Sequence, residues 1–319
     1  MTERQNNRGI ALLATLLAVS LMTLLVVEFT TSAALGYRAA ANQANELRAY
    51  YLARSGIQVG LAILVQDYLV KNSAKVQYDS LDQLWAQPAV PIRVDGGTVW
   101  TSITDEDRKL SINNLFNQQK REPDEQFAAV LTRLLSNIGI SPALIPILID
   151  WLDPDSITSD GGAEADYYLH LTPPYEPRNG PMPTIADLRM LKGMNDATFL
   201  KLSNFLTAMQ IGAGECCVNA NTASPEVLAA LSPELESDSD TVKQIVDMRT
   251  IRPFTKVTDL LNLSGIGTGA EQLKPFVSVN SNFFLITAQG EFAGARKRIY
   301  AIFRRNQNGT ALLLNWHED

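Results

Sequence analysis

One loop of the sequence concentrates the residue types that bind metal ions. No Lys or Arg occurs between Arg133 and Arg178, whereas seven carboxylates do, so this stretch has a charge of −7 and the rest of the chain sums to zero. The seven are Asp150, Asp153, Asp155, Asp160, Glu164, Asp166 and Glu176. Carboxylates at this density repel one another unless water, distant partners or a bound cation screen them. Calcium suits such a loop because it takes six to eight oxygen ligands.

The order of the acids limits the kind of calcium site that the loop can form. The string LIDWLDPDSITSDGGAEADYY has acids at positions 1, 3 and 12 of an EF-hand register, but Ile157 and Thr158 stand where the fifth ligand and the turn glycine belong. An EF-hand is therefore excluded. A different oxygen-rich site is physically reasonable, with Gly161 and Gly162 allowing the turn. Its candidate ligands are Asp153, Asp155, Asp160, Glu164 and Asp166. The alternative is a solvated acidic loop whose aspartates cap helices.

Other residues that could carry chemistry are few. Two histidines and two cysteines in 319 residues exclude a zinc cluster and a disulfide-dense scaffold. His170 and His317 have no nucleophile or acid at a recognisable catalytic spacing, and no G-x-S-x-G, P-loop or G-x-G-x-x-G string occurs, so we expect no enzyme. Cys216 and Cys217 are adjacent. A strained vicinal disulfide, a bond to another chain and two buried thiols all stay open for this pair.

The strings VNANTASPEVLAAL, VKQIVDMR, PFTKVTDLL and LSGIG resemble a helix-hairpin-helix fold, whose glycine-rich hairpin can offer backbone N–H groups to phosphate. The charge argues against this use. Residues 219–275 contain five basic and eight acidic residues, and the hairpin from Ser264 to Gly267 carries no Lys or Arg. The whole chain has a net charge of −7 and no basic excess with which to neutralise nucleic acid. We therefore expect that this part of the chain has a helix-hairpin-helix fold as a structural scaffold and does not bind nucleic acid.

The amino terminus predicts a membrane helix. Ile10 to Val27 forms a charge-free run of eighteen residues after a short polar segment with Arg4 and Arg8. Such a run can cross the hydrocarbon core, and the two arginines favour a cytoplasmic amino terminus. Three interpretations compete: an ordinary anchor, a prepilin-type leader, and a secretory signal peptide cut after small residues. The last would use Ala33, Ala34 or Ala39 to Ala41.

The pair Arg8-Gly9 directly before IALLATLL resembles the cleavage site of a prepilin peptidase, which cuts after the glycine on the cytoplasmic side. The resemblance predicts cleavage between Gly9 and Ile10; removal of nine residues from 319 leaves 310. Type IV pilins and pseudopilins usually carry Glu at the fifth mature position, where it is taken to pair with the amine of a neighbouring subunit. Ala14 occupies that position here. An unpaired intramembrane carboxylate is costly, so a subunit with no neighbour ahead of it has no use for one.

The elements that must position these residues are a long helix, a sheet and a set of shorter helices. Apolar residues keep helical spacing without proline from the membrane segment to about residue 72, which predicts one continuous helix. Strand-type runs follow at 98–104 and 110–114 and, after a long interval, at 283–292, 295–305 and 310–316, with turns at Gly290, Gly294 and Asn308-Gly309. The interval is helical in pattern. Its predicted helices span 125–138, 141–152, 184–194, 196–209, 224–231 and 240–250.

This organisation resembles that of the K-type minor pseudopilins of type II secretion systems. The strings LIDWLDPDS, GGAEADYYLHLTPPYEPRNGP, DLRMLKGM and VNANTASPEVLAAL, with a tryptophan near the carboxyl terminus, carry the resemblance over nearly the whole chain. It implies an α+β fold: a long amino-terminal membrane helix on an antiparallel pilin-type sheet, with a large all-α domain, helix-hairpin-helix or SAM-like, inserted into the sheet. The implied segments are a leader (1–9), the long helix (10–72), the sheet (73–115 and 276–319) and the insert (116–275).

The resemblance also implies a function. K-type pseudopilins bind calcium in their helical domain, which favours calcium over a solvated acidic loop. The implied role is to cap the tip of the periplasmic pseudopilus and so support its assembly and protein export. The implied partners are the I- and J-type minor pseudopilins, other inner-membrane components of the secretion system and the prepilin peptidase, and the implied location is the inner membrane, single pass, with a periplasmic carboxyl-terminal part. The alternative is a membrane-tethered or exported protein that binds calcium or DNA through the insert.

Overall fold

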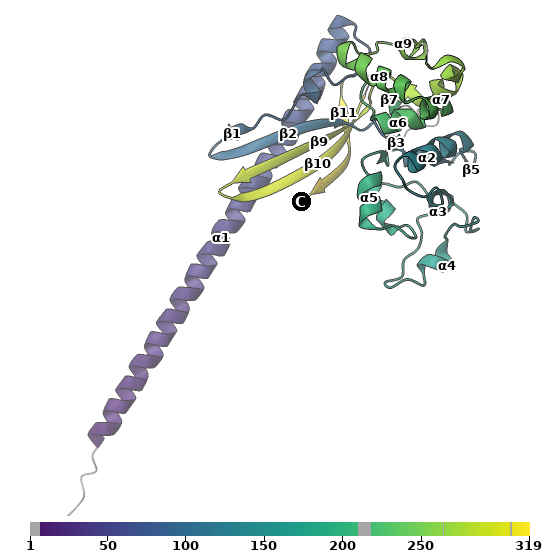
Figure 1. Ribbon diagram of the computed structural model, residues 1–319. Helices are drawn as coiled ribbons and strands as arrows, with labels where there is room; N and C mark the ends of the chain where they lie inside the picture. Colours follow the sequence, from purple (N-terminus) through teal and green to yellow (C-terminus); the bar gives the residue numbers. More distant parts are fainter. Residues whose placement is uncertain (1–6, 210–217, 264, 307) are drawn as a thin grey trace, which may run out of the picture.

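The computed structural model describes residues 7–209, 218–263, 265–306 and 308–319. Helix α1 (Asn7–Ala74) has 68 residues and is therefore about 100 Å long. Its apolar amino-terminal part contacts nothing and is long and hydrophobic enough to cross a membrane, with a mean hydropathy of 2.7 in its best window. Figure 1 shows this half of α1 extending far from the rest of the molecule. The predicted continuous helix is thus confirmed, and it ends two residues later than expected.

The carboxyl-terminal half of α1 packs on a five-stranded antiparallel sheet with the order β1-β2-β9-β10-β11. The strands are β1 (Ile92–Val94), β2 (Gly97–Asp105), β9 (Phe283–Phe292), β10 (Ala295–Arg305) and β11 (Ala311–Glu318). Gly290 lies within β9 and not at the predicted turn; its missing side chain instead allows the helix to approach closely, since a Cβ there would lie 2.0 Å from the carbonyl oxygen of Ala49. Ile57 and Leu64 of α1 and Phe284, Ile286 and Ile299 of the sheet form a common buried core.

The segment between β2 and β9 forms a second body with its own hydrophobic core, which lies to one side of the sheet near the carboxyl-terminal end of α1 (Figure 1). Its helices are α2 (Glu125–Asn137), α3 (Leu144–Leu152), α4 (Ala165–Tyr168), α5 (Asp196–Leu202), α6 (Pro225–Ala230), α7 (Pro233–Ser237), α8 (Ser239–Ile251), α9 (Val257–Leu261) and α10 (Ala270–Leu273). Strand β2 therefore pairs with a strand that follows it by nearly 180 residues, as the interrupted pattern predicted.

Three details of the insert differ from the sequence prediction. The helix expected over 196–209 ends at Leu202, because Leu206 and Thr207 (β6) pair in parallel with Leu110 and Ser111 (β3). The segment expected to be helical at 184–194 forms a 3-10 helix, η3 (Ile185–Met190). Further two-residue strands lie within or beside the helical region: β4 (Phe116–Asn117), β5 (Glu122–Pro123), β7 (Val218–Asn219) and β8 (Val277–Ser278). The SAM-like character and the domain boundaries stay predictions.

A buried polar network joins the insert to the sheet and to the end of α1, and we call it the junction. It is built around Asp79, Asp105 and Asp107. Asp105 Oδ2 accepts hydrogen bonds of 2.6 Å from the hydroxyls of Thr222 and Ser281. Asp79 forms ion pairs of 2.6 Å with both Lys71 of α1 and Arg305 of β10. Asp107 accepts from the backbone N–H groups of residues 282 and 283. Each carboxylate of the junction thus has several donors.

Candidate metal centre

Three carboxylates converge where α3 ends and α4 begins, and we call them the trio: Asp150, Asp153 and Glu164. Asp150 lies in the last turn of α3 and Asp153 is its C-cap, three residues further on, so both point to the same side of the helix. Glu164 is the N-cap residue of α4. The three residues each offer an oxygen, and these oxygens lie within 4.8 Å of one another. All three are buried, at 0%, 6% and 3% exposure.

The loop between the two helices wraps around Asp150. The carboxylate of Asp150 accepts hydrogen bonds from the backbone N–H groups of Ser159, at 3.2 Å, and of Ala163, at 2.8 Å. Gly161 has a φ of +82°, a left-handed conformation that favours glycine. A Cβ at Gly162 would lie 1.9 Å from Asp150 Oδ2, so only glycine fits there. The two glycines therefore serve as predicted: they let the loop turn tightly against the acid.

Three oxygens of the other two members of the trio lack hydrogen-bond donors. Asp153 Oδ1 and both carboxylate oxygens of Glu164 are buried without a partner in the described part of the chain. Burial, together with the charges of neighbouring aspartates, raises the pKa of Asp153 to about 6 and that of Glu164 to about 7. A buried carboxylate without a donor is costly, and a bound cation removes that cost. The donor set is all oxygen and negatively charged, which fits a hard cation such as calcium.

The structure gathers only part of the predicted ligand set. Asp153 and Glu164 are in the trio, but Asp160 and Asp166 are exposed and lie outside it. Asp155 is also exposed; its charge raises the pKa of Asp153 and Glu164, but its carboxylate accepts a hydrogen bond from Ile157 N–H. The structure therefore brings together two of the five predicted ligands, and the full set stays a prediction. The members of the trio lie at the facing ends of α3 and α4, whereas Asp155 and Asp160 lie in the loop between them and Asp166 lies in the first turn of α4.

Sequence reasoning missed Asp150 as a member of the trio. It lies within an apolar helix, LIPILIDWL, where it was counted as part of the charge but not as a ligand. The available signal was its spacing of three residues from Asp153, which places both acids on one face of a helix. His170 and His317 are exposed; a ring nitrogen of His170 contacts Asp166 O, and His317 lies 3.0 Å from Asp319. Cys216 and Cys217 lie outside the described residues.

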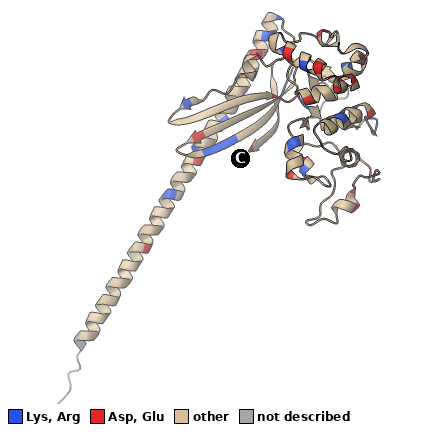
Figure 2. Cartoon of the chain, viewed as in Figure 1, with Lys and Arg blue, Asp and Glu red and all other residues tan. Residues whose placement is uncertain are grey.

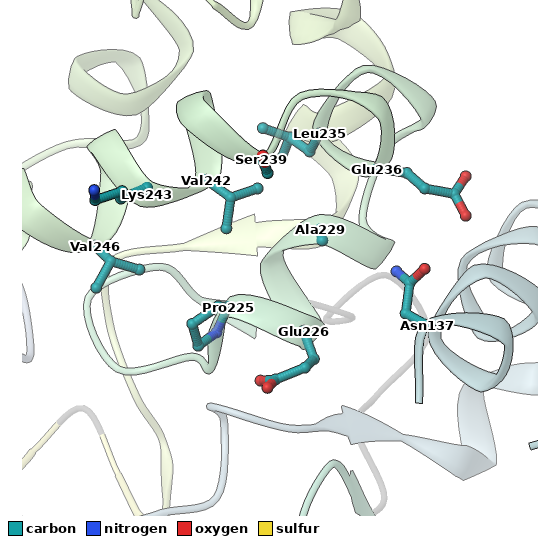
Figure 3. A pocket seen from close by; sticks show the side chains of 10 residues that line it. All are labelled: Asn137, Pro225, Glu226, Ala229, Leu235, Glu236, Ser239, Val242, Lys243 and Val246. Carbon is teal, nitrogen blue, oxygen red and sulfur yellow. The ribbon is translucent and has the colours of Figure 1, made fainter. Parts of the chain in front are cut away.

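A hollow of about 380 Å³ lies on the helix-hairpin-helix-like part of the insert (Figure 3). Its apolar lining comes from α6, α7 and α8 and includes Leu235, Val242 and Val246. Glu226 and Glu236 stand at its rim, with Lys243 at the other side. A rim with two carboxylates and one amine does not attract a phosphate backbone. Figure 2 shows acidic residues spread over these helices, which agrees with the charge count that argued against nucleic acid.

The expected processing site lies at the free end of α1. Gly9 is exposed, and a Cβ there would have no heavy atom within 4 Å. Ile10 is 69% exposed. The helix that follows carries few charged residues until it reaches the sheet (Figure 2). Gly9 is therefore accessible to an enzyme. Because the helix leaves room for a larger side chain at this position, any requirement for glycine must come from that enzyme.

Comparisons with known proteins agree on one family. Two family models, both described as "Type II secretion system (T2SS), protein K", match residues 108–210 and 218–280. The type II secretion system protein K of Klebsiella pneumoniae is 30% identical over 310 residues, which cover 93% of this chain and 91% of the relative. That of Pseudomonas aeruginosa is 28% identical over 312 residues, or 96% of this chain and 91% of the relative.

A solved structure shares the fold. It is a chain of the GspK-GspI-GspJ complex from the type 2 secretion system of enterotoxigenic Escherichia coli, with a TM-score of 0.74 and 19% sequence identity. The similarity covers 88% of this chain and 99% of the other. The two chains therefore share a fold over most of the length of this chain.

Proposed function

Because the chain belongs to the type II secretion system protein K family, we propose that it is the minor pseudopilin that caps the tip of the periplasmic pseudopilus. In this role it supports assembly of the fibre and protein export. Before assembly the apolar half of α1 anchors it in the inner membrane, with a single pass and with the sheet and insert in the periplasm. The charge-free run and the two arginines before it support this orientation.

The observation that carries the tip assignment is the place of the insert. It lies beside the carboxyl-terminal end of α1, away from the apolar half (Figure 1). In a fibre whose subunits stack with their long helices roughly parallel, this end is where a further subunit would have to pack. A second body with its own core occupies that space. The insert fits at an end of the fibre, where nothing has to pass it.

Ala14 supports the same assignment. A carboxylate at this position would pair with the amine of a subunit ahead in the fibre, and alanine offers no such pairing. We expect Ala14→Glu to leave fibre assembly unchanged or to reduce it, because the charge enters hydrocarbon at a cost of roughly 2.5–3.5 kcal/mol. More fibres per cell with this variant than with wild type would contradict the tip assignment.

The proposed partners are the I- and J-type minor pseudopilins, since the structural relative was solved in a complex with both. Other inner-membrane components of the secretion system and the prepilin peptidase are further proposed partners. A direct test of the position uses gold-labelled antibody against the insert on sheared pseudopili. Gold at one end of each fibre is expected. Gold along the fibre, in the pattern given by antibody against the main fibre subunit, would reject the tip role.

Processing by the prepilin peptidase is tested with a matched pair of variants. Gly9 and Gly36 are both exposed on α1, and a Cβ at either would meet no neighbour within 4 Å. Gly9→Val should leave a precursor nine residues longer, while Gly36→Val should mature normally, as read by mass spectrometry of the amino terminus. A mature chain that begins near Ala34 to Ala41 would instead support secretory export and the rival function of an exported calcium- or DNA-binding protein.

We further propose that the trio binds calcium in the insert. The unpartnered oxygens of Asp153 and Glu164 support this proposal, because the ion would supply the positive charge that they lack. Calcium binding to the native state alone would stabilise it by about 2.7 kcal/mol at one hundred times Kd. The melting temperature of the metal-stripped full chain in detergent micelles should rise with calcium and much less with magnesium, which demands octahedral geometry. A melting temperature that ignores calcium and chelator would reject the site.

A further inference from the structure

One lysine fastens the acidic loop to the rest of the insert. Lys192 follows η3, and its ammonium donates a hydrogen bond of 2.9 Å to the carbonyl oxygen of Gly162. The same ammonium lies 5.2 Å from the ring centroid of Tyr167. The backbone N–H of Lys192 donates to the hydroxyl of Tyr168 at 3.3 Å. A single residue thus holds the loop that ends at the trio and both tyrosines of α4.

In the described part of the chain, two hydrogen bonds reach the acidic loop from outside: Asn179 Nδ2 donates to Asp155 O at 2.6 Å near the start of the loop, and Lys192 donates to Gly162 O close to Glu164. Ser159 and Ala163 donate to the carboxylate of Asp150, and Gly162 donates to Ser159 O at 2.8 Å. Among the described residues, only the bond from Lys192 joins the later part of the loop, residues 156–164, to a part of the chain beyond residues 150–168. The bonds from Ser159 and Ala163 depend on Asp150, whose oxygens a cation would also use. The bond from Lys192 does not compete with the cation, because it holds a backbone carbonyl.

We propose that Lys192 is a positioning residue for the trio: it holds the acidic loop in its cation-binding arrangement before the cation arrives. This inference rests on the proposed calcium site. Three buried carboxylates repel one another when no cation is present, so the free loop gains by opening. A fastening from outside keeps Glu164 near Asp150 and Asp153 and lowers the entropic cost of binding. Lys192 does not itself contact the cation.

Lysine suits this task for two reasons. Its ammonium can donate to the Gly162 carbonyl and lie over the Tyr167 ring at the same time, so two weak restraints act through one group. It also brings a positive charge to a stretch of chain, 134–177, that has none of its own. Outer residues of this kind orient metal ligands, and their loss typically weakens metal affinity about 10- to 100-fold.

The test compares two lysine variants of the full chain in detergent micelles, stripped of metal and titrated with calcium by calorimetry. Lys192→Met removes the fastening. Lys201→Met is the matched control, because Lys201 is an exposed lysine of α5 with no side-chain hydrogen bond to the loop. We expect Lys192→Met to raise the Kd for calcium about tenfold and to speed calcium release in a chelator-chase experiment. Lys192→Arg, which keeps a charged donor, should stay close to wild type.

The outcomes separate this inference from the calcium site itself. If wild type binds no calcium, the site is rejected and the role of Lys192 is rejected with it. If wild type binds calcium and Lys192→Met has the same Kd as Lys201→Met, the site stands and the positioning role is wrong. If Lys192→Met does not fold, Lys192→Ala supplies the comparison, because it also removes the donor to Gly162 O. Equal calcium release from Lys192→Ala and wild type would then also reject the role.

Discussion

Two groups of buried carboxylates in this molecule have opposite surroundings. The junction carboxylates are each met by hydroxyls, backbone N–H groups or basic side chains. Within the trio, Asp150 has backbone donors, whereas Asp153 Oδ1 and both oxygens of Glu164 have none among the described residues. Burial of a charge is tolerated when donors compensate it. The comparison teaches that donors within the protein meet the junction carboxylates, whereas the trio leaves three buried oxygens that the proposed cation would compensate.

The largest expected effect tests the structural side of this comparison. Asp105→Ala removes the acceptor shared by the buried hydroxyls of Thr222 and Ser281, so each loses its hydrogen bond of 2.6 Å. We expect the free energy of unfolding to fall by roughly 3 kcal/mol, measured by urea denaturation in chelator. Asp247→Ala, at an exposed acid of α8, is the control and should change it by less than about 0.5 kcal/mol. Equal losses for the two variants would show that the junction does not hold the insert to the sheet.

A second prediction concerns the fit of the loop on Asp150. Gly162→Ala would place its Cβ 1.9 Å from Asp150 Oδ2, so the loop or the acid must move. We expect a loss of roughly 2 kcal/mol in unfolding free energy and a weaker response to calcium. Gly180→Ala is the control, because its Cβ would meet only an ordinary contact of 3.9 Å. A Gly162→Ala chain that keeps the full calcium response would mean that Asp150 is not needed in its present place.

The trio and the junction also differ in how far the sequence could predict them. The charge-free run, the helical spacing behind it and the turns at Gly294 and Asn308-Gly309 are local patterns, and the long helix and the carboxyl-terminal strands follow from them. The trio lies in the loop where the sequence predicted cation ligands, because carboxylates without nearby bases are visible in one dimension. Which acids are buried was not visible, since this depends on how residues 150–164 fold around α3.

The junction was not predicted at all. Asp79, Asp105 and Ser281 are separated by up to 202 residues, and no local pattern marks them as neighbours. They meet because β2 and β9 pair across the insert. The end of the helix expected over 196–209 was missed for a similar reason, since β6 forms by pairing with β3, almost 100 residues earlier. Long-range pairing can override local helical patterns.

A third prediction is that Glu164→Gln changes the free energy of unfolding, relative to wild type, in opposite directions with and without the cation. In chelator at pH 8, Glu164→Gln removes an unpartnered buried charge and should raise the free energy of unfolding by roughly 1 kcal/mol. With calcium at one hundred times the wild-type Kd, the variant should lose most of the stabilisation that wild type gains. Glu176→Gln, at an exposed acid of the same region, should do neither. Destabilisation of the Glu164→Gln chain in chelator would place Glu164 with the junction carboxylates, as a structural acceptor.

The smallest expected effect is a pH dependence that belongs to the junction. Burial is the main cause that raises the pKa of Asp105, to about 6, and the hydrogen bonds from Ser281 and Thr222 oppose it. Burial and the charge of Asp105 raise the pKa of Asp107 in the same direction. In the unfolded chain an aspartate titrates near 3.9. Between about pH 4 and pH 6 the folded chain therefore holds protons that the unfolded chain has released, so this contribution to stability is full below pH 4 and is lost as the pH rises through 6.

The measurement is the difference in unfolding free energy between wild type and Asp105→Asn across pH 4 to 7, in chelator. The Asn side chain does not titrate, and the carboxylates of the trio are present in both chains and cancel in the difference. Wild type should lose stability relative to the variant as the pH rises, with a slope below about 1.4 kcal/mol per pH unit for one proton. The same slope is expected in a Glu164→Gln background, because the trio lies outside the junction. A flat difference would mean that the donors around Asp105 compensate its burial fully; a slope that disappears with Glu164→Gln would show that the two carboxylate groups are coupled through the insert.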